Sequence, residues 1–197
     1  MDDVTFAARR ASAGAGLRPE DLDSRFKSLV QSPLSEPASA DEGALAEVGI
    51  SLQRHARRRL GRSLSIREVD AGSCNGCELE IHALSNAFYD LERFGLRFVA
   101  SPRHADVLLV TGPVTKNMRE ALERTYRATP DPKWVVAVGD CAINCGVFAD
   151  SYACAGPVSA VIPVDLEVQG CPPAPISILR GLLALLDGTN VGKPSRR

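Results

Sequence analysis

Six cysteines are the residues of this chain whose type and spacing could do chemistry. Cys74 and Cys77 form a C-x2-C pair, in which a short turn can aim two sulfurs at one centre. Cys141 and Cys171 follow far along the chain, and two prolines come directly after Cys171. In a chain whose cysteines stay reduced, such clustering indicates metal binding or redox chemistry rather than structural disulfides.

The spacing leaves several kinds of site open. Structural zinc usually takes its thiolates from two close-spaced pairs, whereas here one pair is joined by single distant cysteines. A cysteine followed by proline, as at Cys171, is typical of bacterial iron-sulfur ligation. A thiol-disulfide pair and unrelated buried cysteines are further alternatives, and a dithiol site would need only the C-x2-C pair. The spacing therefore favours an iron-sulfur site over zinc.

Three cysteines lie between the C-x2-C pair and Cys171, and spacing alone does not choose among them. Cys141 is best placed, because it directly follows the apolar run WVVAV and is flanked as Gly-Asp-Cys-Ala. Cys145 and Cys154 are expected to be small buried residues. They stay reserve candidates for the site.

Short apolar runs alternate with helical patterns from Ser65 onward, which predicts βαβ units and a mostly parallel α/β sheet. We expect strands at 66–70, 97–100, 107–111 and 134–138, and an extended segment at 161–168. We expect helices over 117–128 and 175–187 before Gly188, and one after GSCNGC that carries Ile81, Leu84, Phe88 and Leu91 and ends at Gly95. Ligand sites of open α/β sheets gather beyond the carboxyl ends of the strands, so the cysteines that follow strands can meet there.

Composition divides the chain into four parts. Residues 1–43 are rich in Ala, Ser, Gly, Pro and charge, and we expect a flexible N-terminal arm. Residues 44–64 are expected to form an amphipathic helix with a basic end. This helix is either a solvated surface helix or a docking element for a partner or anionic lipid, with Leu45, Val48 and Leu52 on its other side. Residues 65–188 are the expected site-bearing domain, and 189–197 a C-terminal tail.

Several function classes fit poorly. A formal charge of -1 and a pI near 6.3 give no overall basic field for nucleic acid. The start lacks a signal-peptide pattern, and the longest apolar run is too short to span a bilayer, so we expect a cytoplasmic chain. The segment Thr111-Gly112-Pro113-Val114-Thr115 lacks the glycine spacing and the lysine of a P-loop, so we expect no nucleotide.

Four blocks of sequence resemble a known family: DAGSCNGCELEI, SPRHADVLLVTGPVTKNM, GDCA and PVDLEVQGCPP. They resemble the small electron-transfer subunit of membrane-bound nickel-iron hydrogenases, and most of all the formate hydrogenlyase small subunit. The corresponding subunit of the NADH-quinone oxidoreductases, complex I, is similar through the same blocks, but it carries adjacent cysteines where this chain has Gly76-Cys77. The resemblance covers about Ser65 to Leu186.

The resemblance implies a flavodoxin-like domain with one 4Fe-4S cluster on Cys74, Cys77, Cys141 and Cys171. It implies a role as the electron-transfer subunit of an oxidoreductase, close to a nickel-iron centre in a partner large subunit. Further implied partners are ferredoxin-like iron-sulfur subunits and membrane subunits, which would hold the chain at the cytoplasmic face of the membrane. The alternatives are the corresponding subunit of a quinone-reducing, complex I-like enzyme and, from another class, a structural zinc interaction module.

Three further residues are candidates near such a cluster. Glu80 matches a carboxylate found just after the second cysteine in these subunits, and its other interpretation is a first-turn glutamate that interacts with the helix dipole. Arg103 and His104 are either in a solvated turn or have a role beside the cluster or on the quinone side, by resemblance to complex I. In place of the family's Gly-rich stretch after the third ligand, this chain has the segment 142–146, which contains Cys145.

Overall fold

The computed structural model describes residues 42–187. The chain separates into two units, residues 1–39 and 40–197, and all described residues lie in the second. Apart from residues 42 and 43, the predicted arm 1–43 lies outside the described residues, and so does the predicted tail 189–197. Within 42–187, no helix is long and apolar enough to cross a membrane.

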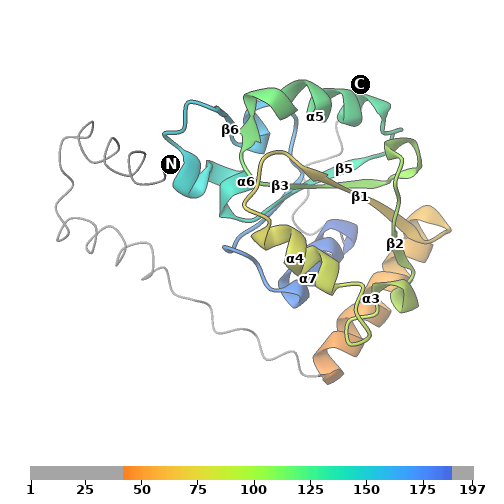
Figure 1. Cartoon of the computed structure of the whole chain (residues 1–197). Coiled ribbons are helices and arrows are strands. Elements are labelled where there is room, and N and C mark those ends of the chain that lie inside the picture. Colours follow the sequence, from red (N-terminus) through yellow and green to blue (C-terminus); the bar gives the residue numbers. More distant parts are fainter. Residues whose placement is uncertain (1–41, 188–197) are drawn as a thin grey trace, which may run out of the picture. The chain divides into compact units, whose positions relative to one another are not determined.

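The described unit is built on a five-stranded parallel sheet (Figure 1). The strands are β1 (Leu64–Asp70), β2 (Leu96–Phe98), β3 (Val107–Thr111), β5 (Trp134–Val138) and β7 (Leu166–Val168). Their spatial order is β2-β1-β3-β5-β7. Among the strands of this sheet alone that order is 2-1-3-4-5, the flavodoxin-like one. The predicted mostly parallel α/β fold is confirmed.

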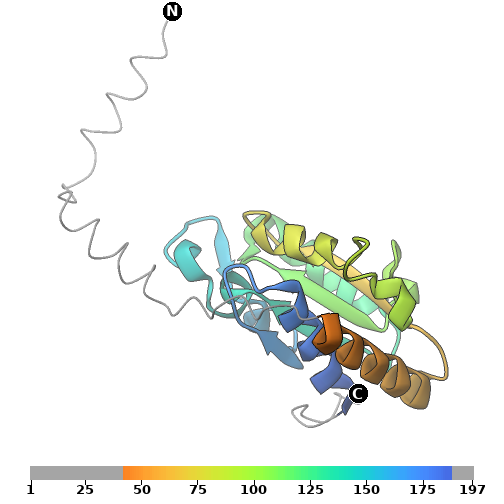
Figure 2. The same cartoon turned by 90° about the horizontal axis from the view of Figure 1, so that it is seen from below.

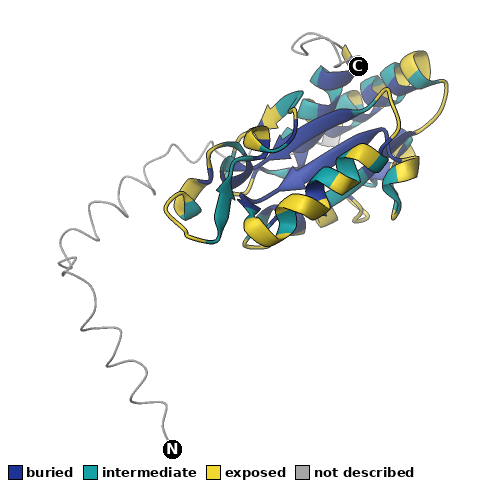
Figure 3. Ribbon diagram, turned by 90° about the horizontal axis from the view of Figure 1, so that it is seen from above, coloured by how far each residue is buried: buried dark blue, intermediate teal, exposed yellow. Residues whose placement is uncertain are grey.

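Helices cover both faces of the sheet, so its central strands are buried throughout. Helices α3 (Glu42–Leu60), α4 (Gly76–Ala83) and α7 (Pro175–Asp187) lie on one face, and α5 (Lys116–Ala128) and α6 (Asp140–Asn144) on the other (Figures 1 and 2). Every residue of β3 and β5 is buried, as Figure 3 shows. Val107 and Leu109 pack on the α3-α4-α7 side, and Leu108 and Val110 on the α5 side. This two-sided burial explains why the strands are continuous apolar runs.

Shorter elements fill the connections. Strand β4 (Val114–Thr115) pairs antiparallel with β6 (Cys154–Gly156) in a small second sheet that the sequence pattern did not predict, because both strands are too short to show a periodicity. Within residues 42–187 there are four short 3-10 helices: η1 (Leu91–Phe94), η2 (Pro102–His104), η3 (Gly146–Phe148) and η4 (Val158–Ala160).

The prediction of a helix that runs to Gly95 is wrong, because the observed helix is shorter. Helix α4 ends at Ala83, and the side-chain oxygen of Asn86 then accepts hydrogen bonds from the backbone N–H groups of Phe88 and Tyr89, each at 2.9 Å. These side-chain hydrogen bonds replace the helical ones where the chain turns. Phe88, which was expected on the buried side of the helix, is 47% exposed. Gly95 does end an element, but that element is η1.

The other predicted elements agree with the structure to within a few residues. Strands 107–111 and 134–138 have the predicted bounds, and the first strand begins two residues earlier than predicted, at Leu64. The extended segment 161–168 is a strand only over Leu166–Val168. Leu45 and Leu52 of α3 are buried in the core against α7 and the sheet, so docking by this helix would have to use its basic side. Docking itself stays a prediction.

Candidate iron-sulfur site

The four predicted ligands follow the carboxyl ends of three strands that end level with one another. The register aligns Asp70 of β1 with Thr111 of β3, Thr111 with Val138 of β5, and Val138 with Val168 of β7. Cys74 and Cys77 come after β1, Cys141 after β5 and Cys171 after β7. The loops that carry them therefore emerge from one edge of the sheet, the end at which α6 and β6 lie in Figure 1.

The thiols are close enough to influence one another. Burial raises the pKa of Cys77 to about 12, and negative charge on Glu78 and on the other three cysteines adds to the rise. Burial likewise raises the pKa of Cys141 to about 11, with contributions from Cys171 and Cys74. The two inner thiols thus have the two outer ones as electrostatic neighbours at this edge of the sheet, and a common ligand set stays a prediction.

Two of the four thiols are buried in the fold, and two are exposed to solvent. Cys77 and Cys141 are 9% and 8% exposed, whereas Cys74 and Cys171 are exposed. Both inner thiols lie in the first turn of a short helix, Cys77 in α4 and Cys141 in α6. A group held by all four would have one side against the protein core and another side toward solvent or a partner.

The backbone passes so close to the inner sulfurs that only glycine fits. At Gly139 a Cβ atom would lie 2.5 Å from Cys77 Sγ, and at Gly146 it would lie 2.9 Å from Cys141 Sγ. Both glycines also have positive φ, +89° and +46°. The backbone N–H of Val147 donates a hydrogen bond to the Cys141 sulfur and lowers its pKa. Close backbone and N–H groups at sulfur are features that tune an iron-sulfur cluster.

A hydrogen-bonded clamp ties the loop of Cys141 to that of Cys171. The Asp140 N–H donates to the Gly170 carbonyl at 2.9 Å, and the Gly170 N–H donates to Asp140 Oδ1 at 2.9 Å. The Gly139 N–H donates to the Val168 carbonyl at 2.8 Å, so the sheet ladder continues into the site. The peptide bond between Cys171 and Pro172 is cis.

A second set of bonds shapes the loop before Cys74. Oδ1 of Asp70 accepts hydrogen bonds from the N–H groups of Gly72 at 2.7 Å and Ser73 at 2.8 Å. The Thr115 hydroxyl donates to the Ala71 carbonyl at 3.1 Å. These positioning residues were missed in the sequence, although an aspartate just before Gly-Ser at a strand end is a signal for such a turn.

The two reserve candidates, Cys145 and Cys154, are free thiols that lie next to each other. Cys145 is 6% exposed and Cys154 half-buried, which agrees with the expectation for Cys145. Burial raises the pKa of Cys145, and a neighbouring charge on Cys154 and a hydrogen bond between the two thiols add to the rise. Cys145 is tied to Cys141 through the backbone, since its N–H donates to the Cys141 carbonyl at 3.0 Å.

The three further candidates do not gather at the thiols. Glu80 is half-buried on α4, and its charge raises the pKa of Tyr89, after the larger effect of burial there. Arg103 and His104 are in η2, just before β3 begins, and the cysteines follow the opposite ends of the strands. A role for any of the three against a partner stays a prediction.

Glu78 is a residue that sequence reasoning missed. It directly follows Cys77, it is only 7% exposed, and both its carboxylate oxygens are buried without a hydrogen-bond partner among the described residues. A glutamate in the first turn of a helix is common, so the sequence carries no signal of this burial. The orphaned carboxylate lies beside the inner thiol whose pKa it raises.

The donor set fits an iron-sulfur cluster. Four thiols are the usual ligands of a 4Fe-4S cluster, in which each thiolate binds a different iron. Within residues 42–187, no group of three or more His, Cys, Asp or Glu side chains converges as the ligands of one metal ion would. Cys74, Cys77, Cys141 and Cys171 stay the predicted ligands of such a cluster.

Comparisons with known proteins find relatives with high sequence identity to this chain. The chain is 49% identical over 128 residues to "Probable membrane-bound hydrogenase subunit mbhJ" of Pyrococcus furiosus, a match covering 65% of this chain and 77% of that protein. It is 41% identical to formate hydrogenlyase subunit 7 of Escherichia coli, over 76% of this chain and 57% of that protein. It is 46% identical to an NADH-quinone oxidoreductase subunit of Citrifermentans bemidjiense, over 56% of this chain and 65% of that protein.

A solved structure shares the fold. One polypeptide of the membrane-bound sulfane sulfur reductase, an archaeal respiratory membrane complex, matches with a TM-score of 0.59 and 38% sequence identity, over 73% of this chain and 77% of that one. Residues 74–185 match the family described as NADH ubiquinone oxidoreductase, 20 Kd subunit, and this span begins at Cys74 and includes all four predicted ligands. This protein therefore belongs to the NADH ubiquinone oxidoreductase 20 Kd subunit family.

Proposed function

We propose that this chain is the electron-transfer subunit of a membrane-associated, hydrogenase-type oxidoreductase complex, and that it holds one 4Fe-4S cluster on Cys74, Cys77, Cys141 and Cys171. The single observation that carries the proposal is that the four thiols lie in three loops that follow the level carboxyl ends of three strands, at one edge of the sheet. Family membership and relatives named as hydrogenase and formate hydrogenlyase subunits support the oxidoreductase role.

The residues of this chain would hold the cluster and keep water away from part of it. A bound 4Fe-4S cluster supplies one-electron transfer at a potential set by charge, hydrogen bonds to sulfur and solvent exposure. Cys77 and Cys141 would anchor its inner side, where burial excludes water from two of the four sulfurs. Their raised pKa values mean that the free thiols are protonated at neutral pH, so binding of iron must release their protons.

The outer side of the site is suited to a partner. Cys74 and Cys171 are exposed, and the apolar side chains of Leu79 and Val147 near the inner thiols are 63% and 66% exposed. Leu79 is two residues from Cys77, and Val147 supplies the N–H that bonds to Cys141. Exposed apolar side chains in the loops and helices that carry the cysteines suit a surface that a partner protein covers. We propose that the large subunit with the nickel-iron centre covers it, as the resemblance implies.

Two branches of the family remain to be separated by experiment. The C-x2-C spacing with Gly76 before Cys77 favours the hydrogenase branch, while the 46% identity to an NADH-quinone oxidoreductase subunit favours a quinone-reducing complex as the second candidate. The two differ in the metal of the large subunit. Affinity purification of the tagged chain with its partners, followed by nickel analysis, tests this: a large partner with nickel supports the hydrogenase branch, and a nickel-free partner with quinone reduction contradicts it.

The test of the cluster itself uses the chain purified without oxygen. We expect about four iron and four acid-labile sulfide per chain, together with a visible absorption that bleaches on reduction. Cys171→Ser should lose both, and Cys154→Ser, which removes a thiol outside the proposed set, should keep both. One zinc per chain without sulfide would contradict the cluster and favour a structural zinc module. Full loading of Cys171→Ser with loss in Cys154→Ser would contradict the ligand assignment.

A further inference from the structure

The C-terminal half of α3 carries a concentration of positive charge that the proposed function does not use. Arg54, Arg57, Arg58 and Arg59 lie within six residues of this helix, in a chain whose formal charge is -1. Cations in the last turn of a helix complement its dipole, which accounts for one or two of them. Four arginines in six residues exceed what the dipole requires. We call these four residues the basic surface.

Most of the basic surface points away from the fold. Leu52 and Ala56 are at most 1% exposed and mark the side of α3 that faces the core. At 100° per residue, Arg54, Arg57 and Arg58 fall on the opposite side of the helix. All three are exposed. The guanidinium groups therefore form one stripe that faces solvent.

The stripe has no acidic partner in the part of the chain that the structure describes. Among residues 42–187, no ion pair or side-chain hydrogen bond engages any of the four arginines of the basic surface, although other arginines of the same region are paired. The neighbouring Arg62, for example, forms a two-pronged pair with the carboxylate of Asp106, at 2.6 and 2.9 Å. The arginines of α5 make i,i+4 pairs, as between Arg119 and Glu123. Within the described fold, the charge of the basic surface is thus not neutralised and suits an external anion.

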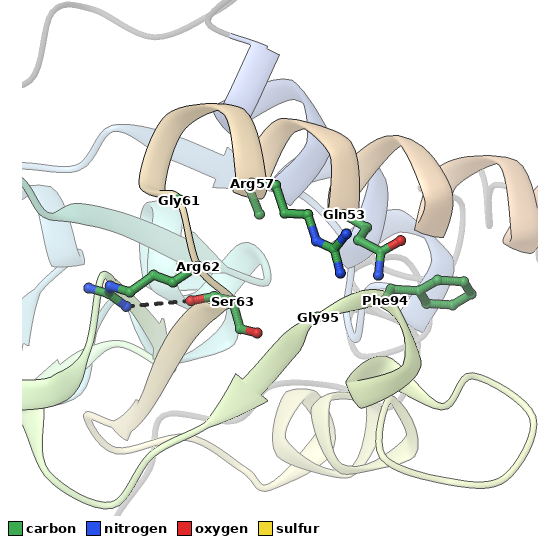
Figure 4. A pocket seen from close by; sticks show the side chains of 8 residues that line it. Gln53, Arg57, Gly61, Arg62, Ser63, Phe94 and Gly95 are labelled. Atoms are coloured by element: carbon green, nitrogen blue, oxygen red, sulfur yellow. Dashed lines mark hydrogen bonds between the residues drawn. The ribbon is translucent and has the colours of Figure 1, made fainter.

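A depression of about 350 Å³ lies beside the stripe, and the polar side chains that line it can all donate hydrogen bonds to phosphate. Arg57 and Gln53 reach from α3 into it, Ser63 offers a hydroxyl, and Phe94 and Gly95 line its opposite wall (Figure 4). None of its lining residues is acidic. A guanidinium fork, an amide N–H and a hydroxyl are the groups that bind phosphate oxygens.

We propose that the basic surface and this depression bind the phosphate head groups of anionic phospholipids. A single free phosphate would occupy only the depression, whereas the charges continue along α3 beyond it and match an extended anionic layer. Ile50, 52% exposed and one turn before Arg54 on the same side of the helix, adds an apolar group for the interfacial region. The contact lies at the start of β1, whereas the cysteines follow the carboxyl ends of the strands.

Vesicle binding of the full chain tests the proposal. The chain is sedimented with vesicles of phosphatidylglycerol and phosphatidylcholine, and with pure phosphatidylcholine vesicles for comparison. We compare the wild type with the triple variant R54Q/R57Q/R58Q. The matched control is R119Q/R124Q/R127Q on α5, which removes the same charge from exposed positions of another helix. Circular dichroism and thermal melting check that each variant keeps its fold.

We expect binding to the anionic vesicles only, weakened on the order of 100-fold in the α3 variant, since each arginine near an anionic surface contributes about fivefold, and nearly unchanged in the α5 control. Equal losses in both triple variants would overturn the proposal, because they would show a response to net charge alone. So would an equal affinity for inorganic phosphate, which would indicate a small-anion site, or preferred binding to duplex DNA. Absence of binding to the anionic vesicles would also overturn it.

Discussion

Replacing Gly139 by alanine is the sharpest test of how the site is built. Gly139 has φ +89° and ψ 156°, a backbone region that side chains rarely adopt, and an added Cβ would lie 2.5 Å from Cys77 Sγ. For ordinary contact that distance would have to open to at least 3.4 Å. Because the Gly139 N–H is bonded to Val168, the glycine backbone is held by the sheet and the sulfur must move.

The expected loss of stability in Gly139→Ala has two parts. The backbone strain is about 1–3 kcal/mol, and the forced displacement of buried atoms adds about 1–3 kcal/mol. Displacing one ligand sulfur should also lower cluster occupancy. We therefore expect Gly139→Ala to lower the free energy of unfolding of the metal-free chain and to reduce iron and acid-labile sulfide per chain, measured by urea unfolding and by metal analysis after anaerobic reconstitution.

Gly61→Ala is the matched control. Gly61 also has a positive φ, +68°, but nothing lies within 4 Å of its added Cβ. This variant should show the backbone cost alone, about 1–2 kcal/mol, and full iron loading. If Gly139→Ala loads as much iron as Gly61→Ala and is no less stable, then the close approach of the backbone to the Cys77 sulfur does not shape the site, and the reasoning is refuted.

Two further predictions concern the metal-free chain. Folding raises the pKa of Cys77 to about 12 and of Cys141 to about 11, from an ordinary value of 9.0, so the folded state holds these protons more tightly than the unfolded state. The free energy of unfolding should fall as the pH rises from 9 toward 12, and a metal-free Cys77→Ala/Cys141→Ala variant with the same slope would contradict this. Asp106→Ala removes a 5% exposed carboxylate that accepts hydrogen bonds from Arg62 and from the buried Ser65 N–H. Asp106→Ala should lower the free energy of unfolding, measured with urea, by about 1–3 kcal/mol. Glu120→Ala, which removes one partner of an exposed ion pair, should lower it by less than about 0.5 kcal/mol.

Elements whose structure depends on nearby residues were predicted correctly, and those that depend on distant contacts or on side-chain hydrogen bonds were not. Strands 107–111 and 134–138 were predicted with their observed bounds, because two-sided burial requires unbroken apolar runs. The end of α4 was missed, because the hydrogen bonds of the Asn86 side chain compete with the helix in a way that apolar spacing does not report. The pairing of β4 with β6 depends on two- and three-residue strands far apart in the sequence, and local pattern carries no information on it.

By itself, the sequence determined the donor chemistry and the alternation of strands and helices. From these two it follows that cysteines placed after strands can gather at one edge of a parallel sheet. Only the tertiary structure decided which thiols are inside, that Cys145 forms a hydrogen bond with Cys154, that Gly139 lies against a sulfur and that Glu78 is buried without a partner among the described residues. The physical reason is that burial, pKa and close approach depend on residues brought together from distant parts of the chain, whereas residue type and period are local properties.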